Sequence, residues 1–377
     1  MSNKKAEQIL NAGVSMWLDS LSREMLDSGW LKERLTSWGL RGQTSNPTIF
    51  EKAVSKGSSY DPAVKEAAEK GLTREQLCWD LMSDDVQRAC DLFLPLYKES
   101  KGGDGYVSLE LDPTRADDTE ASIAQAHQLW KTVDRPNLML KVPGTEAGLP
   151  VLEELLACGY NVNVTLLFSE ERYREVMEHF MKGLERRVDQ GQPIDSIASV
   201  ASFFISRVDS EVDSQLDKIG SKEALALKGK IAVANARVAY AAYQEVLENS
   251  ERFAKLQAKG AQLQRPLWAS TSTKDPSYPD TLYVDELIGP NCVNTLPENT
   301  LEAALDHGKT EVTLNKENEK LARQELAQLK ALGVDLHQIT NVLLVEQGVE
   351  KFAQSYESLV STLGEALKAA QSAGATS

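Results

Sequence analysis

Polar side chains that can do chemistry stand at the ends of short apolar runs in this 377-residue chain. Lys141 follows the apolar residues 138–140, and burial at such a position favours the neutral amine, which can attack a carbonyl carbon. Two acids stand in equivalent places: Asp19 follows residues 14–18, and Glu110 follows residues 106–109. This set predicts carbonyl chemistry, in which Glu110 relays protons through water and Asp19 takes a hydroxyl proton as a carbon–carbon bond breaks.

Each of these residues also has a simpler interpretation. Lys141 could extend to solvent or bind phosphate as a point charge, and the two acids could be its salt-bridge partners. Polar residues often follow strands simply because loops are polar. The occurrence of one lysine and two acids together favours chemistry, and further polar residues stand at the ends of the other runs: Thr44, Asn46, Asn163, Thr165, Ser202, Ser270, Asn294 and Thr295.

Short apolar runs alternate with stretches of helical periodicity along the whole chain, which is typical of a parallel sheet covered by helices. Two helix starts are predicted from capping residues, at Thr119 and at Ser169. Eight units favour a (β/α)₈ barrel, whose active sites lie at the carboxyl ends of the strands. The predicted strands cover residues 14–18, 40–42, 106–109, 138–140, 161–164, 197–201, 267–269 and 292–294.

Two segments exceed a minimal barrel. Residues 48–101, after the second strand, have room for extra helices, so we expect an insertion there. Residues 336–370 carry a helical apolar stripe, followed by an expected frayed tail at 371–377. The stripe could pack outside the barrel, but Phe352 and Tyr356 could also cover its mouth and exclude water. No linker marks a second domain, so residues 1–377 are predicted to form a single barrel domain.

The composition limits the partners and the location. Lys and Arg number 41 and Asp and Glu 56, a formal net charge of −15, so nucleic acid and anionic membranes are unlikely partners. A phosphorylated ligand must therefore meet local positive groups. The four cysteines are scattered, which suits a reducing compartment. The polar start of the chain does not resemble a signal peptide and no apolar run is long enough to span a bilayer, so we expect a cytoplasmic protein.

No cofactor is expected. The four histidines are isolated from one another and form no HExxH motif or Cys/His cluster, so no metal is predicted. The chain also has no GxGxxG motif and no Walker A loop, so no nucleotide cofactor is predicted.

Several segments resemble one known family. Residues 43–50 (QTSNPTIF) resemble the first transaldolase signature, and residues 138–145 (LMLKVPGT) resemble the segment that carries the family's Schiff-base lysine. Residues 17–23, 107–112, 161–169 and 201–207 match further family segments in the same order. The chain is therefore identified as a member of the transaldolase family, of the longer bacterial, class I type, from about Trp17 to the final helix.

This resemblance implies a role for each residue at the strand ends. Lys141 would form the Schiff base, Asp19 would be the acid and base of aldol cleavage and addition, and Glu110 with Thr165 would hold a catalytic water. The substrate-binding residues would be Thr44, Asn46, Asn163, Ser202, Arg207, Ser270 and Lys274, with Arg207, Ser202 and Ser270 at the phosphate. The chain departs from the family pattern at Ser272, which stands where a second phosphate-binding arginine is expected, so Lys274 is a candidate replacement.

The implied activity is transfer of a dihydroxyacetone unit from a ketose phosphate (sedoheptulose 7-phosphate or fructose 6-phosphate) to an aldose phosphate (glyceraldehyde 3-phosphate or erythrose 4-phosphate), in the non-oxidative pentose phosphate pathway. The partners would be sugar phosphates alone, and the protein would be a monomer or a homodimer. Three alternatives remain at this point: a fructose 6-phosphate aldolase-like enzyme, a non-covalent sugar-phosphate isomerase and a sugar-phosphate sensor.

Overall fold

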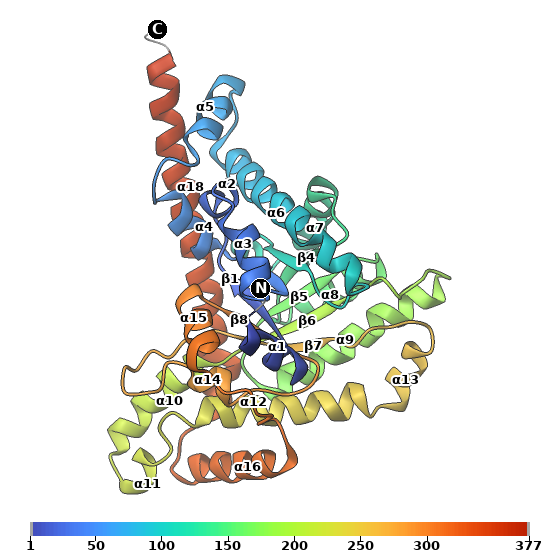
Figure 1. Cartoon of the computed structure of the whole chain (residues 1–377), viewed down its shortest axis with the longest axis vertical. Helices are drawn as coiled ribbons and strands as arrows, with labels where there is room; N and C mark the ends of the chain where they lie inside the picture. The colour runs from blue at the N-terminus through green and yellow to red at the C-terminus, as the bar shows by residue number, and fades with distance from the viewer. Residues whose placement is uncertain (1–2, 375–377) are drawn as a thin grey trace.

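The computed structural model describes residues 3–374, and its centre is a closed barrel of eight parallel strands that follow one another in chain order (Figure 1). This confirms the predicted (β/α)₈ barrel. The strands are β1 (Val14–Asp19), β2 (Gly42–Thr44), β3 (Tyr106–Glu110), β4 (Leu138–Pro143), β5 (Val162–Leu167), β6 (Ser199–Phe204), β7 (Arg265–Ala269) and β8 (Cys292–Leu296).

Helices surround the barrel and cover both of its ends (Figure 1). They are α1 (Lys4–Asn11), α2 (Arg23–Asp27), α3 (Trp30–Ser37), α4 (Pro47–Val54), α5 (Asp61–Lys70), α6 (Arg74–Glu99), η1 (Pro113–Arg115), α7 (Thr119–Val133), α8 (Gly148–Ala157), α9 (Glu170–Asp189), α10 (Ser206–Ile219), α11 (Lys222–Leu225), α12 (Ile231–Tyr243), η2 (Gln244–Glu248), α13 (Glu251–Gln257), α14 (Leu282–Asp285), α15 (Glu298–His307), α16 (Lys316–Ala331), α17 (Leu336–Gln338), η3 (Ile339–Leu343) and α18 (Leu344–Gly374).

The strands are placed as predicted, with shifts at their ends. The second strand begins at Gly42 rather than at residue 40, because pairing starts where the chain meets Trp17 of β1. A Cβ atom at Gly42 would lie 2.5 Å from the Trp17 ring, so only glycine lets the ring cross β2 there. Strands β5 and β6 start later than predicted and run on to Leu167 and Phe204.

Both segments beyond a minimal barrel are helical. The insertion at residues 48–101 holds most of α4 and all of α5 and α6, and a capping box between Thr73 and Gln76 starts α6. The final helix runs beyond residue 370 to Gly374, so the expected tail is wrong at 371–374, and residues 375–377 lie outside the described part. It passes along α4, α5 and α6, as the red helix in Figure 1 shows.

Capping residues explain where several helices start. Ser169 accepts a hydrogen bond from the Arg172 amide at the start of α9, as predicted. The prediction for α7 is wrong by one residue: Asp118 is the cap, because its carboxylate accepts from the Ala121 amide while Thr119 is already helical. The Thr119 hydroxyl instead donates to the Ala147 carbonyl oxygen.

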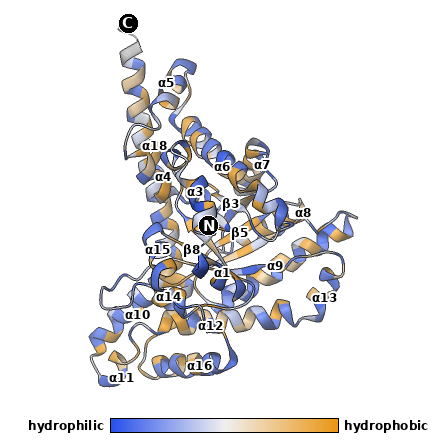
Figure 2. Cartoon of the chain, viewed as in Figure 1, coloured by the Kyte–Doolittle hydropathy of each residue, from blue (hydrophilic) through white to orange (hydrophobic). Residues whose placement is uncertain are grey.

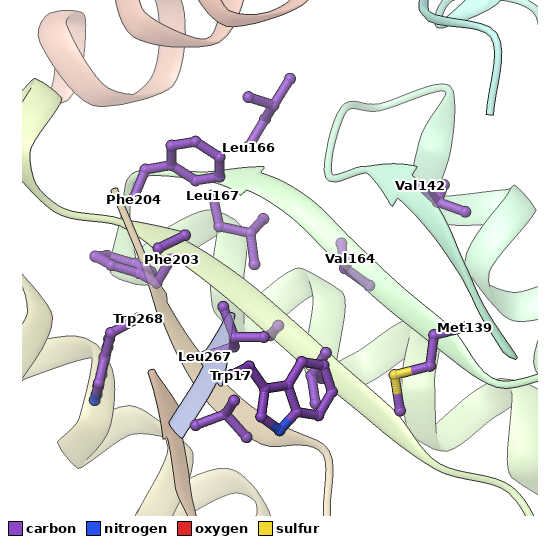
Figure 3. Close-up of a cluster of buried hydrophobic side chains, with 14 of the residues drawn as sticks. Trp17, Met139, Val142, Val164, Leu166, Leu167, Phe203, Phe204, Leu267 and Trp268 are labelled. Atoms are coloured by element: carbon purple, nitrogen blue, oxygen red, sulfur yellow. The ribbon is translucent and has the colours of Figure 1, made fainter. Parts of the chain in front are cut away.

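The barrel wall is apolar, and the helices outside it are amphipathic. Figure 2 shows hydrophilic and hydrophobic colours on the same surrounding helices, as expected of helices with one buried face. Figure 3 shows large side chains from five strands gathered in the core, among them Trp17, Phe203 and Trp268. No helix in residues 3–374 is long and apolar enough to cross a membrane.

An ion cluster joins strands at the amino-terminal end of the barrel. The Asp104 carboxylate accepts one hydrogen bond on each oxygen, from Arg41 Nε at 2.9 Å and from the Arg265 guanidinium at 3.1 Å. Arg265 also donates to the Ser15 hydroxyl of β1 at 3.0 Å. Because Asp104 is buried and Arg41 and Arg265 are only partly exposed, this cluster ties the starts of β1, β3 and β7 together.

Asp104→Asn should lower the free energy of unfolding by about 3 kcal/mol, because it leaves two partly buried guanidinium groups without a counter-charge. Urea unfolding at pH 7 measures this. The control is Glu66→Gln, which removes the exposed Glu66–Lys70 pair and should change stability by less than about 1 kcal/mol. Equal effects in the two variants would show that the cluster does not hold the barrel end.

Candidate active site

The polar residues predicted from the strand ends meet at the carboxyl end of the barrel. Pairing places Asp19 of β1 opposite Thr44 of β2, and Lys141 of β4 between Glu110 of β3 and Asn163 of β5. Asp19, Thr44 and Glu110 are the last residues of β1, β2 and β3, whereas Lys141 and Asn163 lie inside β4 and β5. Consequently their backbones are held by the sheet, and their side chains point from a rigid frame.

Lys141 is buried, with only 4 % of its surface exposed. Its amine Nζ lies 3.5 Å from Glu110 Oε2 and donates to the Ser45 carbonyl oxygen at 3.4 Å. The ring centroid of Phe352, from α18, lies 5.8 Å from the same nitrogen. The amine is therefore enclosed by one carboxylate, one carbonyl and one aromatic face, and it points into the barrel mouth.

Glu110 has a carboxylate with unused hydrogen-bonding capacity. It is as buried as Lys141, and neither of its oxygens has a short hydrogen-bond partner among residues 3–374. Burial raises the pKa of Glu110 to about 7, against the opposing effect of the positive charge of Lys141. A carboxyl that titrates near neutral pH can both give and take a proton.

Thr165 completes this side of the site. Its hydroxyl is buried and likewise has no hydrogen-bond partner in the described chain. The register of β5 against β6 shifts between Val164 and Leu167, and Leu166 within this bulge has a positive φ of 60°. Bulges re-aim side chains next to active sites, and here the bulge immediately follows Thr165.

Asp19 of β1 lies three strands from Lys141 of β4 in the order of the barrel. Burial raises its pKa above the usual range, while Lys141 and a hydrogen bond from Thr44 act in the opposite direction. The Thr44 hydroxyl donates to Asp19 Oδ1 at 2.7 Å. A cleft of about 360 Å³ opens beside Asp19 and is lined in part by Lys52 of α4 and by Lys56, which follows that helix.

Two asparagines are held in fixed orientations. Asn46 caps α4 by accepting the Ile49 amide at 3.0 Å, so its amide nitrogen remains free to donate. Asn163 accepts from the Ser202 hydroxyl at 2.6 Å and donates to Ser108 Oγ at 3.0 Å. Ser202 therefore orients Asn163 in this structure.

A cationic region lies at the ends of β6 and β7. Arg207, at the start of α10, has its guanidinium carbon 5.1 Å from the Phe204 ring centroid and 5.8 Å from that of Phe352. No ion pair or hydrogen bond engages this guanidinium within residues 3–374, and burial lowers its pKa. An arginine without a protein counter-ion is suited to a phosphate.

Ser270 and Lys274 lie next to this region. Ser270 adopts a positive φ of 57°, and its hydroxyl lies 2.8 Å from that of Ser206, the residue before Arg207. Lys274 donates to Ser272 Oγ at 2.7 Å. Partial burial lowers the pKa of Lys274, and the positive charges of Lys351 and Arg207 lower it further. Lys274 thus lies within electrostatic reach of Arg207.

Sequence reasoning missed several neighbours of the site. Lys351 is adjacent in sequence to Phe352, but only the fold brings it near Lys274. Gly348 lets α18 approach the barrel, because a Cβ atom there would lie 2.8 Å from Leu166 Cδ2 and 3.4 Å from an Arg207 nitrogen. Of the two residues expected over the mouth, Phe352 has its ring centroid 5.8 Å from both Lys141 Nζ and the Arg207 guanidinium carbon, whereas Tyr356 lies beside Trp79 of α6 with 5.6 Å between ring centroids.

The arrangement contains the groups for one kind of chemistry. A buried amine can attack a carbonyl, two carboxyl groups on either side can move protons, and a separate cation can bind an anionic end of the same substrate. Among the described residues no group of His, Cys, Asp and Glu side chains is arranged to hold a metal ion.

Comparison with known proteins agrees with this geometry. The family model for transaldolase/fructose-6-phosphate aldolase matches residues 16–363. A transaldolase of Mycolicibacterium smegmatis is 51 % identical over 360 residues, covering 96 % of each chain. Transaldolases of Mycobacterium tuberculosis strain H37Rv and of Mycobacterium ulcerans are each 49 % identical over 349 residues, covering 93 % of each chain.

Proposed function

The chain belongs to the transaldolase/fructose-6-phosphate aldolase family, and we propose that it is a transaldolase that acts through a Schiff base on Lys141. The observation that carries this assignment is the buried Lys141 amine, 3.5 Å from a Glu110 carboxyl that titrates near neutral pH. In the proposed reaction the enzyme transfers a dihydroxyacetone unit from a ketose phosphate to an aldose phosphate, a reaction of the non-oxidative pentose phosphate pathway.

The first stage joins the substrate to the enzyme. The Lys141 amine attacks C2 of the ketose, and the resulting carbinolamine loses water to form an iminium ion. This step needs a proton on the departing hydroxyl. Glu110 supplies it through a water held between its carboxyl and the Thr165 hydroxyl, and both of these groups have hydrogen-bonding capacity to spare.

The second stage breaks and remakes a carbon–carbon bond. Asp19 removes the proton of the C4 hydroxyl, the C3–C4 bond breaks, and its electron pair moves toward the iminium to form an enamine on Lys141. The aldose phosphate leaves, and C3 of the enamine attacks the aldehyde carbon of the acceptor. Asp19 returns its proton to the new hydroxyl, and hydrolysis of the iminium frees Lys141.

Substrate recognition uses the remaining residues. The Asn46 and Asn163 amides contact substrate hydroxyls, and Thr44 and Ser202 keep their neighbours oriented. Arg207 binds the phosphate together with Ser270, and Lys274 supplies the second cation.

Phe352 covers the enamine against water, since premature protonation would release free dihydroxyacetone as an aldolase does.

We also propose that the chain is a single domain, acts in the cytoplasm as a monomer or homodimer, and needs no cofactor.

Lys141→Ala and Lys141→Arg should both abolish turnover and covalent trapping, because a guanidinium cannot become a neutral amine. Borohydride reduction with fructose 6-phosphate, followed by mass spectrometry, measures the adduct. Lys56→Ala, a lysine of the neighbouring cleft, should be trapped like the wild type. Normal adduct in Lys141→Ala would refute the Schiff base, and turnover without any adduct in the wild type would favour a non-covalent isomerase.

Asp19→Asn and Glu110→Gln should fail at different steps. Asp19→Asn retains trapping but slows cleavage by about 10² to 10⁴, the range of a positioned base. Glu110→Gln slows imine formation instead. In the wild type the dehydration rate should fall as pH rises through about 7, where Glu110 loses its proton, and Glu110→Gln should remove this inflection. Rapid-mixing measurements resolve the two steps, and impairment of the same step in both variants would contradict this division.

Arg207→Ala should raise the KM for glyceraldehyde 3-phosphate by about tenfold or more, because a charge-assisted bond is lost, and leave the KM for unphosphorylated glyceraldehyde nearly unchanged. Lys274→Ala should show a smaller defect of the same kind. Lys218→Ala, at the far end of α10, is the matched control. Equal losses on both acceptors would assign Arg207 a structural role, and a silent Lys274→Ala would remove Lys274 from the site.

A further inference from the structure

A chain of two threonine hydroxyls leads to the Asp19 carboxylate across three neighbouring strands. Thr295 Oγ1 of β8 lies 2.6 Å from Thr44 Oγ1 of β2, and Thr44 Oγ1 lies 2.7 Å from Asp19 Oδ1 of β1. Both threonines are almost fully buried, at 3 % and 1 % exposure. In the barrel Thr295 is registered with Trp17, two residues before Asp19, so its side chain reaches Thr44 across β1.

The direction of these hydrogen bonds follows from the donors available. An ionised carboxylate only accepts, so the single hydroxyl proton of Thr44 must go to Asp19. The short contact between the two threonines then has only one possible donor, which is Thr295. The Thr295 hydroxyl therefore donates to Thr44 and holds in place the hydroxyl that donates to Asp19, although it does not touch Asp19 itself.

We propose that Thr295 is a positioning residue for the acid and base of the reaction, acting on Asp19 through Thr44. This inference rests on the proposed role of Asp19. The fixed donor occupies Oδ1 and leaves Oδ2 to take the proton of the substrate hydroxyl and to return it to the acceptor. Because Oδ1 receives a hydrogen bond whether or not Oδ2 carries a proton, the same oxygen serves cleavage and addition.

The chain also acts against the effect of burial on Asp19. Hydrogen bonds to an ionised carboxylate favour the charged form, and polarisation by Thr295 strengthens the bond from Thr44. The other charged groups that act on Asp19 are Lys141 of β4, Lys274 after β7 and Lys52 of α4, and the carboxyl of Glu110 interacts with it from β3. None of these groups is altered when the Thr295 hydroxyl is removed.

The test is the pH dependence of kcat with fructose 6-phosphate and erythrose 4-phosphate. Thr295→Val keeps the shape of the side chain and removes the hydroxyl, so the acidic limb of the profile should move to higher pH by about half to one unit. On that limb the rate falls by about three- to tenfold, and the rates converge at higher pH. Thr295→Ser restores the hydroxyl and should restore the wild-type profile.

Thr271→Val is the matched control. Its hydroxyl is also buried beside β8, but it donates to Asn294 Oδ1 at 2.9 Å and, over 3.5 Å, to the Thr295 backbone carbonyl oxygen, without contacting either threonine hydroxyl of the chain. Its pH profile should match that of the wild type. Thr295→Ala is prepared in parallel, so that failure of the valine variant to fold still leaves a variant without the hydroxyl, and thermal unfolding is followed for all of them.

The outcomes separate this inference from the proposed function. If Thr295→Val or Thr295→Ala has the wild-type profile while Asp19→Asn still blocks cleavage, Thr295 has no positioning role and the assignment of Asp19 stands. If Thr295→Ser is as impaired as Thr295→Val, the hydroxyl is not the cause and the inference is wrong. If the wild type gives no borohydride adduct at Lys141, the proposed function itself fails.

Discussion

Placement of the Lys141 amine inside an apolar barrel is the constraint on which the rest of the site depends. A buried ammonium is costly unless charge or hydrogen bonds compensate, and here one carboxyl, one carbonyl and one aromatic face surround it. The Glu110 carboxyl is buried beside this amine, and its burial raises its pKa to about 7. Their separation of 3.5 Å is that of a direct ion pair.

Several positively charged side chains gather at the barrel mouth although the molecule as a whole is acidic. The chain carries a formal net charge of −15, yet Arg207 and Lys351 both lie within electrostatic reach of Lys274. Repulsion among these cations contributes to the lowered pKa of Lys274, so the region is under like-charge strain until an anion binds. In the proposed function, the substrate phosphate is the anion that relieves this strain.

The C-terminal helix connects these two regions. The Phe352 ring centroid lies 5.8 Å from both the Lys141 nitrogen and the Arg207 guanidinium carbon, so one ring of α18 lies near the lysine and the arginine alike. Gly348 permits the close approach of α18 to the barrel. The Ser355 hydroxyl on the same helix forms a 2.8 Å hydrogen bond with the Thr48 hydroxyl of α4. The insertion after β2 thus supports the helix that covers the site.

The sequence by itself determined the eight strands, the barrel, the Ser169 cap and the strand positions of Lys141, Asp19 and Glu110, because short-range periodicity and capping chemistry are written in windows of a few residues. It could not place the start of β2, which depends on how the Trp17 ring crosses Gly42. Nor could it identify the link between Thr295 and Thr44, which are 251 residues apart and meet only because β8 closes the barrel against β1. Contacts of this kind depend on strand register and on the path of α18, and these are decided only when the whole core packs.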